Sequence, residues 1–210
     1  GLRQCGGLTA TALVTASRLG LRCAYAGRLG SDDMSDYVRR TLEAEGISLE
    51  HACLDPNVRP YLATIVVDTT HNTRNVFFQR PEHHGAADHH PSETLIRKAR
   101  VLYVDHMGIA GQIRAAGIAR RHGIDVTGDP ERVVPRHAEL LRLINHIVLP
   151  KRIAFEITGE ATIERALPKL WHEDAGAVVI TAGQQGAYFQ ASPSEPIQHQ
   201  PAFTVKAVDT

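Results

Sequence analysis

Two short glycine-containing segments of the sequence lie next to predicted helices or strands, one before a helix and one after a strand. Gly6 and Gly7 stand directly before a run of small and apolar residues that is typical of a helix. Thr181, Gly183 and Gly186 form a Thr-x-Gly-x-x-Gly pattern directly after an apolar, β-rich run. Glycine lets a ligand approach the backbone closely, and free backbone N–H groups at such junctions bind anions such as phosphate. A tight turn at the first segment and a hairpin turn at the second explain the same residues, so both interpretations stay open at this point.

The elements that must position these segments alternate between strands and helices. Such alternation implies a mainly parallel sheet with helices on both faces, which is a doubly wound, three-layer α/β fold. Ligands bind to sheets of this kind where strands end and helices begin. The expected strands lie at 21–27, 100–105, 124–127, 146–149 and 177–181, with a last hairpin of 187–190 and 203–205. The expected helices lie before Gly20 and at 33–45, 110–122, 136–143, 151–158 and 161–174.

One β-rich segment interrupts this alternation. Residues 59–68 and 73–80 are both rich in β-branched and aromatic side chains, and the short polar link between them favours a hairpin. We therefore expect a small β attachment at 59–81 that stands apart from the main sheet. The rest of the chain, 1–58 and 82–210, is the expected α/β core.

The composition argues against several classes of partner. The 210 residues include 23 Lys and Arg and 23 Asp and Glu, so the formal net charge is zero. Such a chain has no overall attraction to nucleic acid or to an anionic membrane, and no apolar run reaches the roughly 20 residues that span a bilayer. Three cysteines, an odd number, indicate reduced thiols and a cytoplasmic protein. We expect the ligands to be small molecules.

Two groups of reactive side chains are interpreted as structural. His83, His84, His89 and His90 crowd into one polar loop, but they lack the ligand types and regular spacing of a zinc site. Cys5 lies beside the glycine pair without an evident base to activate it. We expect a solvated loop and a bystander thiol, and no bound structural metal.

The order of the landmarks is more informative than any landmark alone. The glycine pair is followed by Leu29-Gly30-Ser31-Asp32, then by the hairpin, the Thr-x-Gly-x-x-Gly loop and Asp209-Thr210. This order resembles the ribokinase-like, or PfkB, family of carbohydrate kinases over essentially the whole chain, and the segment 18–32 is similar to the family's first signature. The resemblance implies that the hairpin is a lid over a sugar. It also implies transfer of the γ-phosphoryl group of ATP to a sugar hydroxymethyl oxygen with Mg²⁺.

The resemblance assigns residues to the sugar and to the nucleotide. Gly6, Gly7, Thr11 and His106 match sugar-binding positions, although a plain loop residue at a strand end explains His106 equally well. Thr11 stands where ribokinases usually have Asn, which argues against ribose as the substrate. The positions that the resemblance assigns to ATP are Asp129, Thr181, Gly183 and Gly186, and the position for a monovalent cation such as K⁺ is Asp209.

Departures from the family pattern affect the expected activity. The family's Asn-x-x-Glu motif, which organises the Mg²⁺ and phosphate network, would fall at Pro150 and Ile153 and is absent. In the family, the catalytic base belongs to a Gly-Ala-Gly-Asp-like run after the Asp-Thr pair, and this sequence ends at Thr210. The family's first strand, with its sugar-binding Asp, would precede Gly1. We therefore expect a fragment of a longer enzyme, without the catalytic base.

Other functions fit some of the same observations. A nucleoside kinase of the same family shares the landmarks, and a non-catalytic relative that only binds sugar or nucleotide fits the absent motif. An oxidoreductase on a similar sheet is disfavoured, because the chain lacks a Gly-x-Gly-x-x-Gly fingerprint after a first strand. An exposed, β-rich lid would also favour a homodimer formed through the lid.

Overall fold

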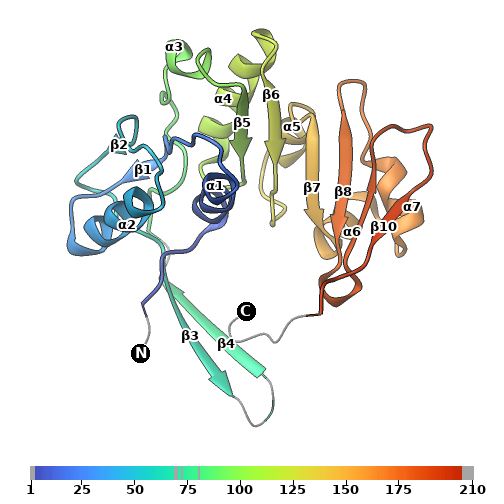
Figure 1. Ribbon diagram of the computed structural model, residues 1–210, viewed down its shortest axis with the longest axis horizontal. Helices are drawn as coiled ribbons and strands as arrows, with labels where there is room; N and C mark the ends of the chain where they lie inside the picture. The colour runs from blue at the N-terminus through green and yellow to red at the C-terminus, as the bar shows by residue number, and fades with distance from the viewer. Residues whose placement is uncertain (1–2, 69–70, 72, 80, 205–210) are drawn as a thin grey trace. The chain divides into compact units, whose positions relative to one another are not determined.

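The computed structural model describes residues 3–68, 71, 73–79 and 81–204 of the chain (Figure 1). The chain folds as two compact units, Gly1–Pro91 and Ser92–Thr210. The first unit holds two helices and two small sheets, and the second is built on one large sheet. Each unit is described by itself.

The helices of the first unit begin in different ways. Gly7 precedes α1 with a φ of +98°, a left-handed conformation that residues with side chains rarely adopt. Before α2, the Asp32 carboxylate accepts a hydrogen bond of 2.8 Å from the Ser35 N–H. The helices and short parallel strands of this unit are α1 (Leu8–Arg18), β1 (Arg28–Leu29), α2 (Asp33–Ala44) and β2 (Cys53–Leu54).

The strand predicted at 21–27 is almost absent. Within it only Ala24 forms a bridge, with Ser48, and regular pairing begins later, in β1. Tyr25 folds back so that its ring occupies the place that a side chain at Gly27 would need, and its hydroxyl donates to the Arg28 carbonyl oxygen at 3.4 Å. The chain therefore bends where a longer strand would have continued.

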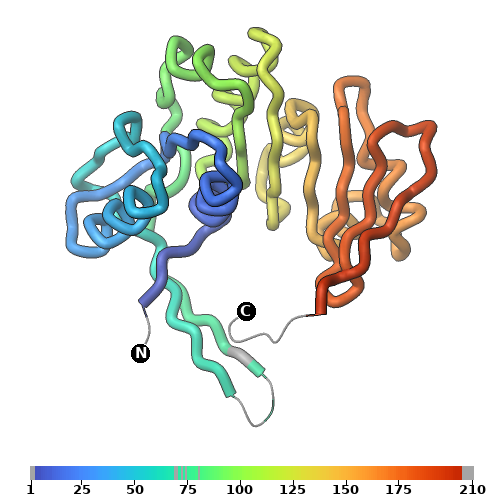
Figure 2. The backbone as a smooth tube through the Cα atoms, in the orientation of Figure 1, coloured from blue at the N-terminus to red at the C-terminus, as the bar shows by residue number. Residues whose placement is uncertain are grey.

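The predicted hairpin is present as a separate two-stranded sheet (Figure 2). β3 (Leu62–Asp68) pairs antiparallel with β4 (Thr73–Gln79) along the whole length of both strands. Apolar side chains are exposed on both faces, with Ile65 and Phe78 on one face and Phe77 on the other. Two strands cannot bury an apolar face between themselves, so the hairpin keeps these side chains available for other contacts.

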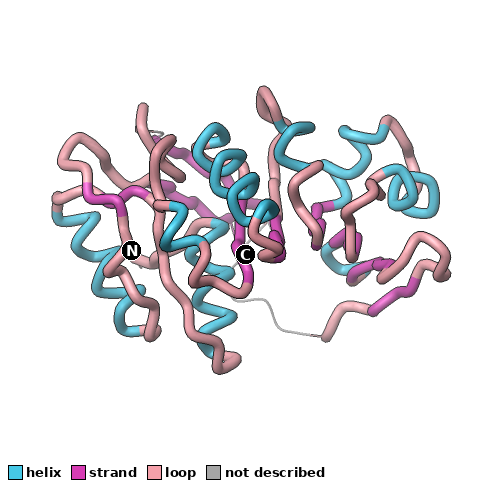
Figure 3. The backbone as a smooth tube through the Cα atoms, turned by 90° about the horizontal axis from the view of Figure 1, so that it is seen from above, coloured by secondary structure: helices cyan, strands magenta, loops and turns pink. Residues whose placement is uncertain are grey.

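The second unit is built on a six-stranded sheet with the order β10-β9-β8-β7-β6-β5. The strands β5 to β8 are parallel, whereas β9 and β10 are added antiparallel at one side. The strands are β5 (Val101–Val104), β6 (Asp125–Gly128), β7 (His146–Pro150), β8 (Ala177–Thr181), β9 (Ala187–Gln190) and β10 (Gln198–Gln200). The helices, cyan in Figure 3, are α3 (Glu93–Ile96), α4 (Ile109–Arg121), α5 (His137–Leu141), α6 (Lys151–Thr158) and α7 (Ile163–Lys169), and a 3₁₀ turn covers Gly183–Gln185.

Two elements of this unit differ from the prediction. Helix α7 ends at Lys169 instead of extending to residue 174, and Pro168 weakens its last turn because it has no N–H to donate to the Glu164 carbonyl oxygen. The last strand among the described residues is β10. Phe203 and Thr204 of the predicted strand 203–205 belong to no strand, and Val205 lies outside the described residues. The ring of His199 stacks on Tyr188 in β9 with 4.3 Å between the ring centroids, which favours the pairing at residues 198–200.

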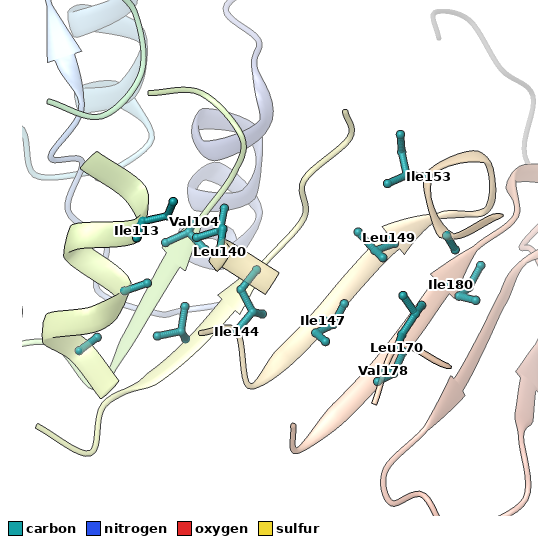
Figure 4. Packing of buried hydrophobic residues seen from close by; sticks show 14 of the residues in the cluster. Val104, Ile113, Leu140, Ile144, Ile147, Leu149, Ile153, Leu170, Val178 and Ile180 are labelled. Carbon is teal, nitrogen blue, oxygen red and sulfur yellow. The ribbon is translucent and has the colours of Figure 1, made fainter. Parts of the chain in front are cut away.

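Alternate residues of the parallel strands form the core of the second unit (Figure 4). Val104, Val126, Ile147 and Val178 come from four neighbouring strands and are all fully or almost fully buried. Helices α4, α6 and α7 contribute buried residues to the same cluster. Because side chains alternate between the two faces of a strand, a shift of one residue would expose this set. Burial of one face therefore specifies the register of the strands.

Candidate functional site at the carboxyl edge of the parallel sheet

The carboxyl ends of β5, β6, β7 and β8 lie along one edge of the sheet, because these strands are parallel neighbours. In the strand register Val104 is level with Gly128, and Pro150 is level with Thr181. In α/β sheets this edge is where ligands bind. The residues that reach it are Asp105 and His106 after β5, Asp129 after β6, Lys151 after β7, and Thr181 with the turn that follows β8.

Asp105 and Gln112 hold the loop that carries His106. The Asp105 carboxylate accepts hydrogen bonds from the Met107 N–H at 2.7 Å and from the Gln112 side-chain amide at 3.0 Å. The same amide donates to the Met107 carbonyl oxygen at 3.1 Å. Asp105, His106 and Gln112 are all buried. His106 is therefore presented by a closed, hydrogen-bonded turn.

Asp129 lies in surroundings that disfavour its negative charge. Its pKa is raised to about 6, by burial first and then by the charges of Glu131 and Asp105. Its Oδ1 atom is buried and has no hydrogen-bond partner among the described residues. The pKa of Tyr103 is also raised, first by burial and then by the charge of Asp129. A cation at this point would relieve the repulsion, and carboxylate oxygens are the ligands that Mg²⁺ prefers.

The two glycines of the Thr181–Gly186 loop serve different physical purposes. Gly183 has a φ of +56°, and open space lies where a side chain would begin. Gly186 has a φ of +88°, and a side chain there would collide with the backbone carbonyl oxygen of Gln200. The Ala182 N–H donates to the Gly186 carbonyl oxygen at 2.8 Å and closes the turn. Gly183 leaves the backbone accessible to a ligand, whereas Gly186 is required by the packing of the chain itself.

A lysine lies beside this loop. Lys151 is the first residue of α6, and its Nζ donates to Oε1 of Gln185 at 3.1 Å. The two positions expected for the Asn-x-x-Glu motif are both non-polar. They are Pro150 and Ile153, and Ile153 is fully buried. The strand end that lacks the family motif therefore carries a basic side chain instead.

The sugar-binding residues predicted in the first unit lie at the start of α1. The Gly7 carbonyl oxygen accepts a hydrogen bond of 3.0 Å from the Thr11 N–H, which forms the first turn of the helix. Open space lies where side chains would begin at Gly6 and Gly7, and Thr11 is exposed. A ligand could reach all three residues. Asp209, predicted to bind a monovalent cation, lies outside the described residues.

Three residues at the sheet edge are not among those predicted from sequence. The sequence could have indicated Asp105, because it directly follows an apolar strand and precedes the predicted His106. Gln112 has none, since a polar residue in a helical pattern does not reveal that its amide turns back to a strand end. Lys151 lies within the segment of the missing motif, where the family pattern draws attention only to Pro150 and Ile153.

The described residues contain neither a ready-made metal cluster nor a membrane-spanning helix. Within that part of the chain, no group of three or more His, Cys, Asp and Glu side chains is placed to hold a metal ion. Mg²⁺ bound mainly by phosphates and water needs only one or two carboxylates, which Asp129 fits. No helix in the described ranges combines the length and the hydropathy that crossing a bilayer requires.

The fold and this edge define an α/β protein that is suited to a phosphate-bearing ligand at the carboxyl ends of its parallel strands. The family model described as pfkB family carbohydrate kinase matches residues 3–210. The chain belongs to this family of carbohydrate kinases. The resemblance indicated by the order of the landmarks is thereby confirmed.

Individual proteins with similar sequences or structures are kinases of sugars. The chain is 24% identical to Fructokinase-2 of Oryza sativa subsp. japonica, and the match covers 98% of the chain and 66% of the rice protein. It superimposes on a fructokinase with bound ATP from Xylella fastidiosa with a TM-score of 0.83 at 18% identity, covering 97% of the chain and 68% of that structure. A ribokinase from Thermotoga maritima gives a TM-score of 0.76 at 21% identity, with 97% and 68% covered.

These structural likenesses confirm the expected fold class, a doubly wound α/β sheet with a small β lid. The chain spans about two thirds of the length of the proteins that it matches.

Replacing Asp129 by Asn is expected to change how stability depends on pH. The native pKa of Asp129, about 6, exceeds its ordinary value of 3.8, so the folded state gains stability from protonation and loses it as the pH rises through 6. A shift of this size corresponds to about 3 kcal/mol when undiminished. Because the group is partly exposed, we expect about 1 kcal/mol.

The Asp129→Asn variant should therefore match the wild type near pH 4 and be about 1 kcal/mol more stable at pH 7. Urea unfolding of both proteins at the two pH values measures this difference. A stability difference that does not change with pH would contradict the raised pKa.

Proposed function

We propose that the protein containing this chain phosphorylates a free sugar at the expense of ATP, with a ketohexose such as fructose as the acceptor. Membership of the pfkB family supports the reaction, and the fructokinases among the similar proteins support the acceptor. The observation that carries the proposal is the edge formed by β5 to β8. Along that edge lie a buried histidine, a partly buried carboxylate, a lysine and an open glycine turn.

The proposed site for the ATP phosphates is the loop after β8. Thr181 offers a hydroxyl, and the open backbone at Gly183 offers N–H groups of the kind that bind phosphate. Asp129 would hold Mg²⁺ through its unpartnered oxygen, together with the nucleotide's own phosphates and water. When bound, the ion neutralises charge on the phosphoryl group being transferred. Asp209 is proposed for a monovalent cation such as K⁺ on the sequence pattern alone.

The residues proposed to bind the sugar are those that the family pattern assigns to it, Gly6, Gly7, Thr11 and His106. Gly6 and Gly7 would offer backbone N–H groups, and the exposed Thr11 a hydroxyl. His106 would offer a ring nitrogen from a turn that Asp105 and Gln112 hold in place. Since Thr11 replaces the Asn usual in ribokinases, the pattern supports a sugar other than ribose.

In the proposed reaction the sugar hydroxymethyl oxygen forms a bond to the γ-phosphorus of ATP. The bond between that phosphorus and the β,γ-bridging oxygen breaks, and ADP leaves with this oxygen. The hydroxyl proton goes to a carboxylate base. In the family pattern that base follows the Asp-Thr pair that Asp209 and Thr210 match. The residues described here would contribute by positioning the reactants and by placing charge near the phosphates.

We also propose that the protein is cytoplasmic. The three cysteines are free thiols, which supports a location in the cytoplasm, where ATP is also available.

The second candidate function is a relative that binds ATP and sugar without turnover. Pro150 and the fully buried Ile153 favour this candidate, because neither can supply the polar groups of the Asn-x-x-Glu motif in any conformation.

The full-length protein carrying this sequence is expected to release ADP from ATP and Mg²⁺ when fructose is present. With ribose or adenosine at equal concentration we expect release to be slower by roughly tenfold or more, because mismatched hydroxyls leave buried polar groups unpaired. A coupled assay for ADP gives the rates. Adenosine as the best acceptor would make the protein a nucleoside kinase, and ATP binding without turnover on any pentose, hexose or nucleoside would support the non-catalytic candidate.

Replacing His106 by Asn is expected to raise the KM for the sugar about 10- to 100-fold, the effect of losing one hydrogen bond in a buried site. The KM for ATP should change by less than about twofold. Steady-state kinetics measure both constants, and His89→Asn, an exposed histidine of the polar loop, is the matched control. Equal losses in both constants would show that His106 maintains the fold instead of contacting the sugar.

We also propose that the hairpin of β3 and β4 mediates a homodimer. Among the described residues each of its strands pairs only with the other, and Phe77 is 64% exposed. Light scattering of the wild-type protein should give twice the chain mass, and Phe77→Asp should give a monomer because it places a charge in the interface. Phe203→Asp, which changes another exposed phenylalanine outside the hairpin, should leave the dimer intact. A monomeric wild type would refute the proposal.

A further inference from the structure

The ammonium group of Lys151 lies against the loop to which the ATP phosphates are assigned. Its Nζ donates to Oε1 of Gln185 at 3.1 Å, and Gln185 is the last residue of the 3₁₀ turn that Gly183 opens. The contact joins two segments that are 34 residues apart in sequence and that follow the paired strands β7 and β8. The lysine is thus held at the carboxyl edge of the sheet.

Within the described residues Lys151 has no carboxylate partner, which distinguishes it from its neighbour. Arg152 forms an ion pair with Glu156 at 3.4 Å and donates to the Glu131 carbonyl oxygen at 3.0 Å. The Lys151 Nζ instead stands over the Phe155 ring, 5.6 Å from its centre, a cation–π contact that brings no negative charge to the lysine. An ammonium group has three donors, and the amide of Gln185 takes one. Among the described residues no carboxylate pairs with this ammonium group, and two of its donors remain for an anion.

The surroundings indicate which anion this is. Gly183, in the same turn as Gln185, leaves open space beside the backbone. Pro150 and Ile153 leave the end of β7 without the polar side chains through which the family pattern organises phosphate and metal. A lysine can take over part of this role, because an ammonium binds phosphate oxygens as a point charge without exact geometry.

We propose that Lys151 binds the phosphate chain of ATP, replacing part of the charge neutralisation that the absent Asn-x-x-Glu motif provides. The inference rests on the proposed function, since it takes ATP to be the ligand of the β8 loop. It goes beyond that function by assigning phosphate binding to a residue outside the family pattern. It also implies that ATP binds measurably without Mg²⁺.

Calorimetric titration of the full-length protein with ATP in the presence of EDTA tests the proposal. Lys151→Met should weaken ATP binding about 10- to 100-fold, the effect of losing a charge-assisted hydrogen bond. The matched control is Lys98→Met, an exposed lysine in the turn that enters β5 at the opposite edge of the sheet, and it should bind ATP like the wild type. Adenosine, which has no phosphate, should bind equally to all three proteins.

A second variant separates charge from folding. Lys151→Arg keeps the positive charge and should retain ATP affinity within about threefold, with an unfolding midpoint equal to that of Lys151→Met. If Lys151→Met binds ATP as tightly as the wild type, or if Lys151→Arg is as weak as Lys151→Met, the proposal is wrong while the proposed function stands. If the wild type binds no ATP with or without Mg²⁺, both are wrong.

Discussion

The burial of one face of the parallel sheet is the constraint on which the rest of the second unit depends. Val104, Val126, Ile147 and Val178 must all reach the same core, and this requirement specifies how each strand lies beside the next. The strand ends become level as a consequence. Residues far apart in the sequence, such as His106 and Thr181, thereby share an edge. The chemistry of the edge is thus a product of apolar packing elsewhere in the sheet.

Charge is distributed unevenly along that edge. The ends of β5 and β6 carry Asp105, Asp129 and Glu131, and their mutual repulsion adds to the effect of burial on the pKa of Asp129. The end of β7 carries Lys151, which has no carboxylate partner among the described residues. Phosphates accompanied by a metal ion present both signs of charge, so they complement an edge of this kind better than a neutral ligand would. This complementarity links the proposed nucleotide site to the proposed role of Lys151.

The glycine pattern after β8 shows that a motif can combine two causes. Gly183 is left-handed and open, which suits a ligand, whereas Gly186 is needed because the backbone at Gln200 lies against it. Both glycines belong to the same Thr-x-Gly-x-x-Gly pattern, and the pattern does not separate the two purposes. A substitution at Gly186 would disturb the antiparallel strands at the side of the sheet, whatever its effect on nucleotide binding.

Local sequence patterns were sufficient for most of the elements. Apolar runs that alternate with helical segments indicated the strands β5 to β8 and the helices between them, and the β-rich segments near Ile65 and Phe77 indicated the hairpin. The order of glycine and acidic landmarks indicated the family. The predictions of a strand at 21–27 and of strand structure at 203–204 were wrong. The folding back of Tyr25 and the stacking of His199 on Tyr188 are contacts that no period in the sequence reveals.

The sequence by itself thus determined the fold class, the family and the segments that border the site. The tertiary structure alone decided which side chains interact. Gln112 donates a hydrogen bond to Asp105, and Lys151 donates one to Gln185. The charges of Glu131 and Asp105 raise the pKa of Asp129. The physical reason is that hydrogen bonds and charge interactions depend on distances of a few ångströms. For residues far apart in the chain those distances follow from strand order and register, whereas helix and strand periods are already written in neighbouring residues.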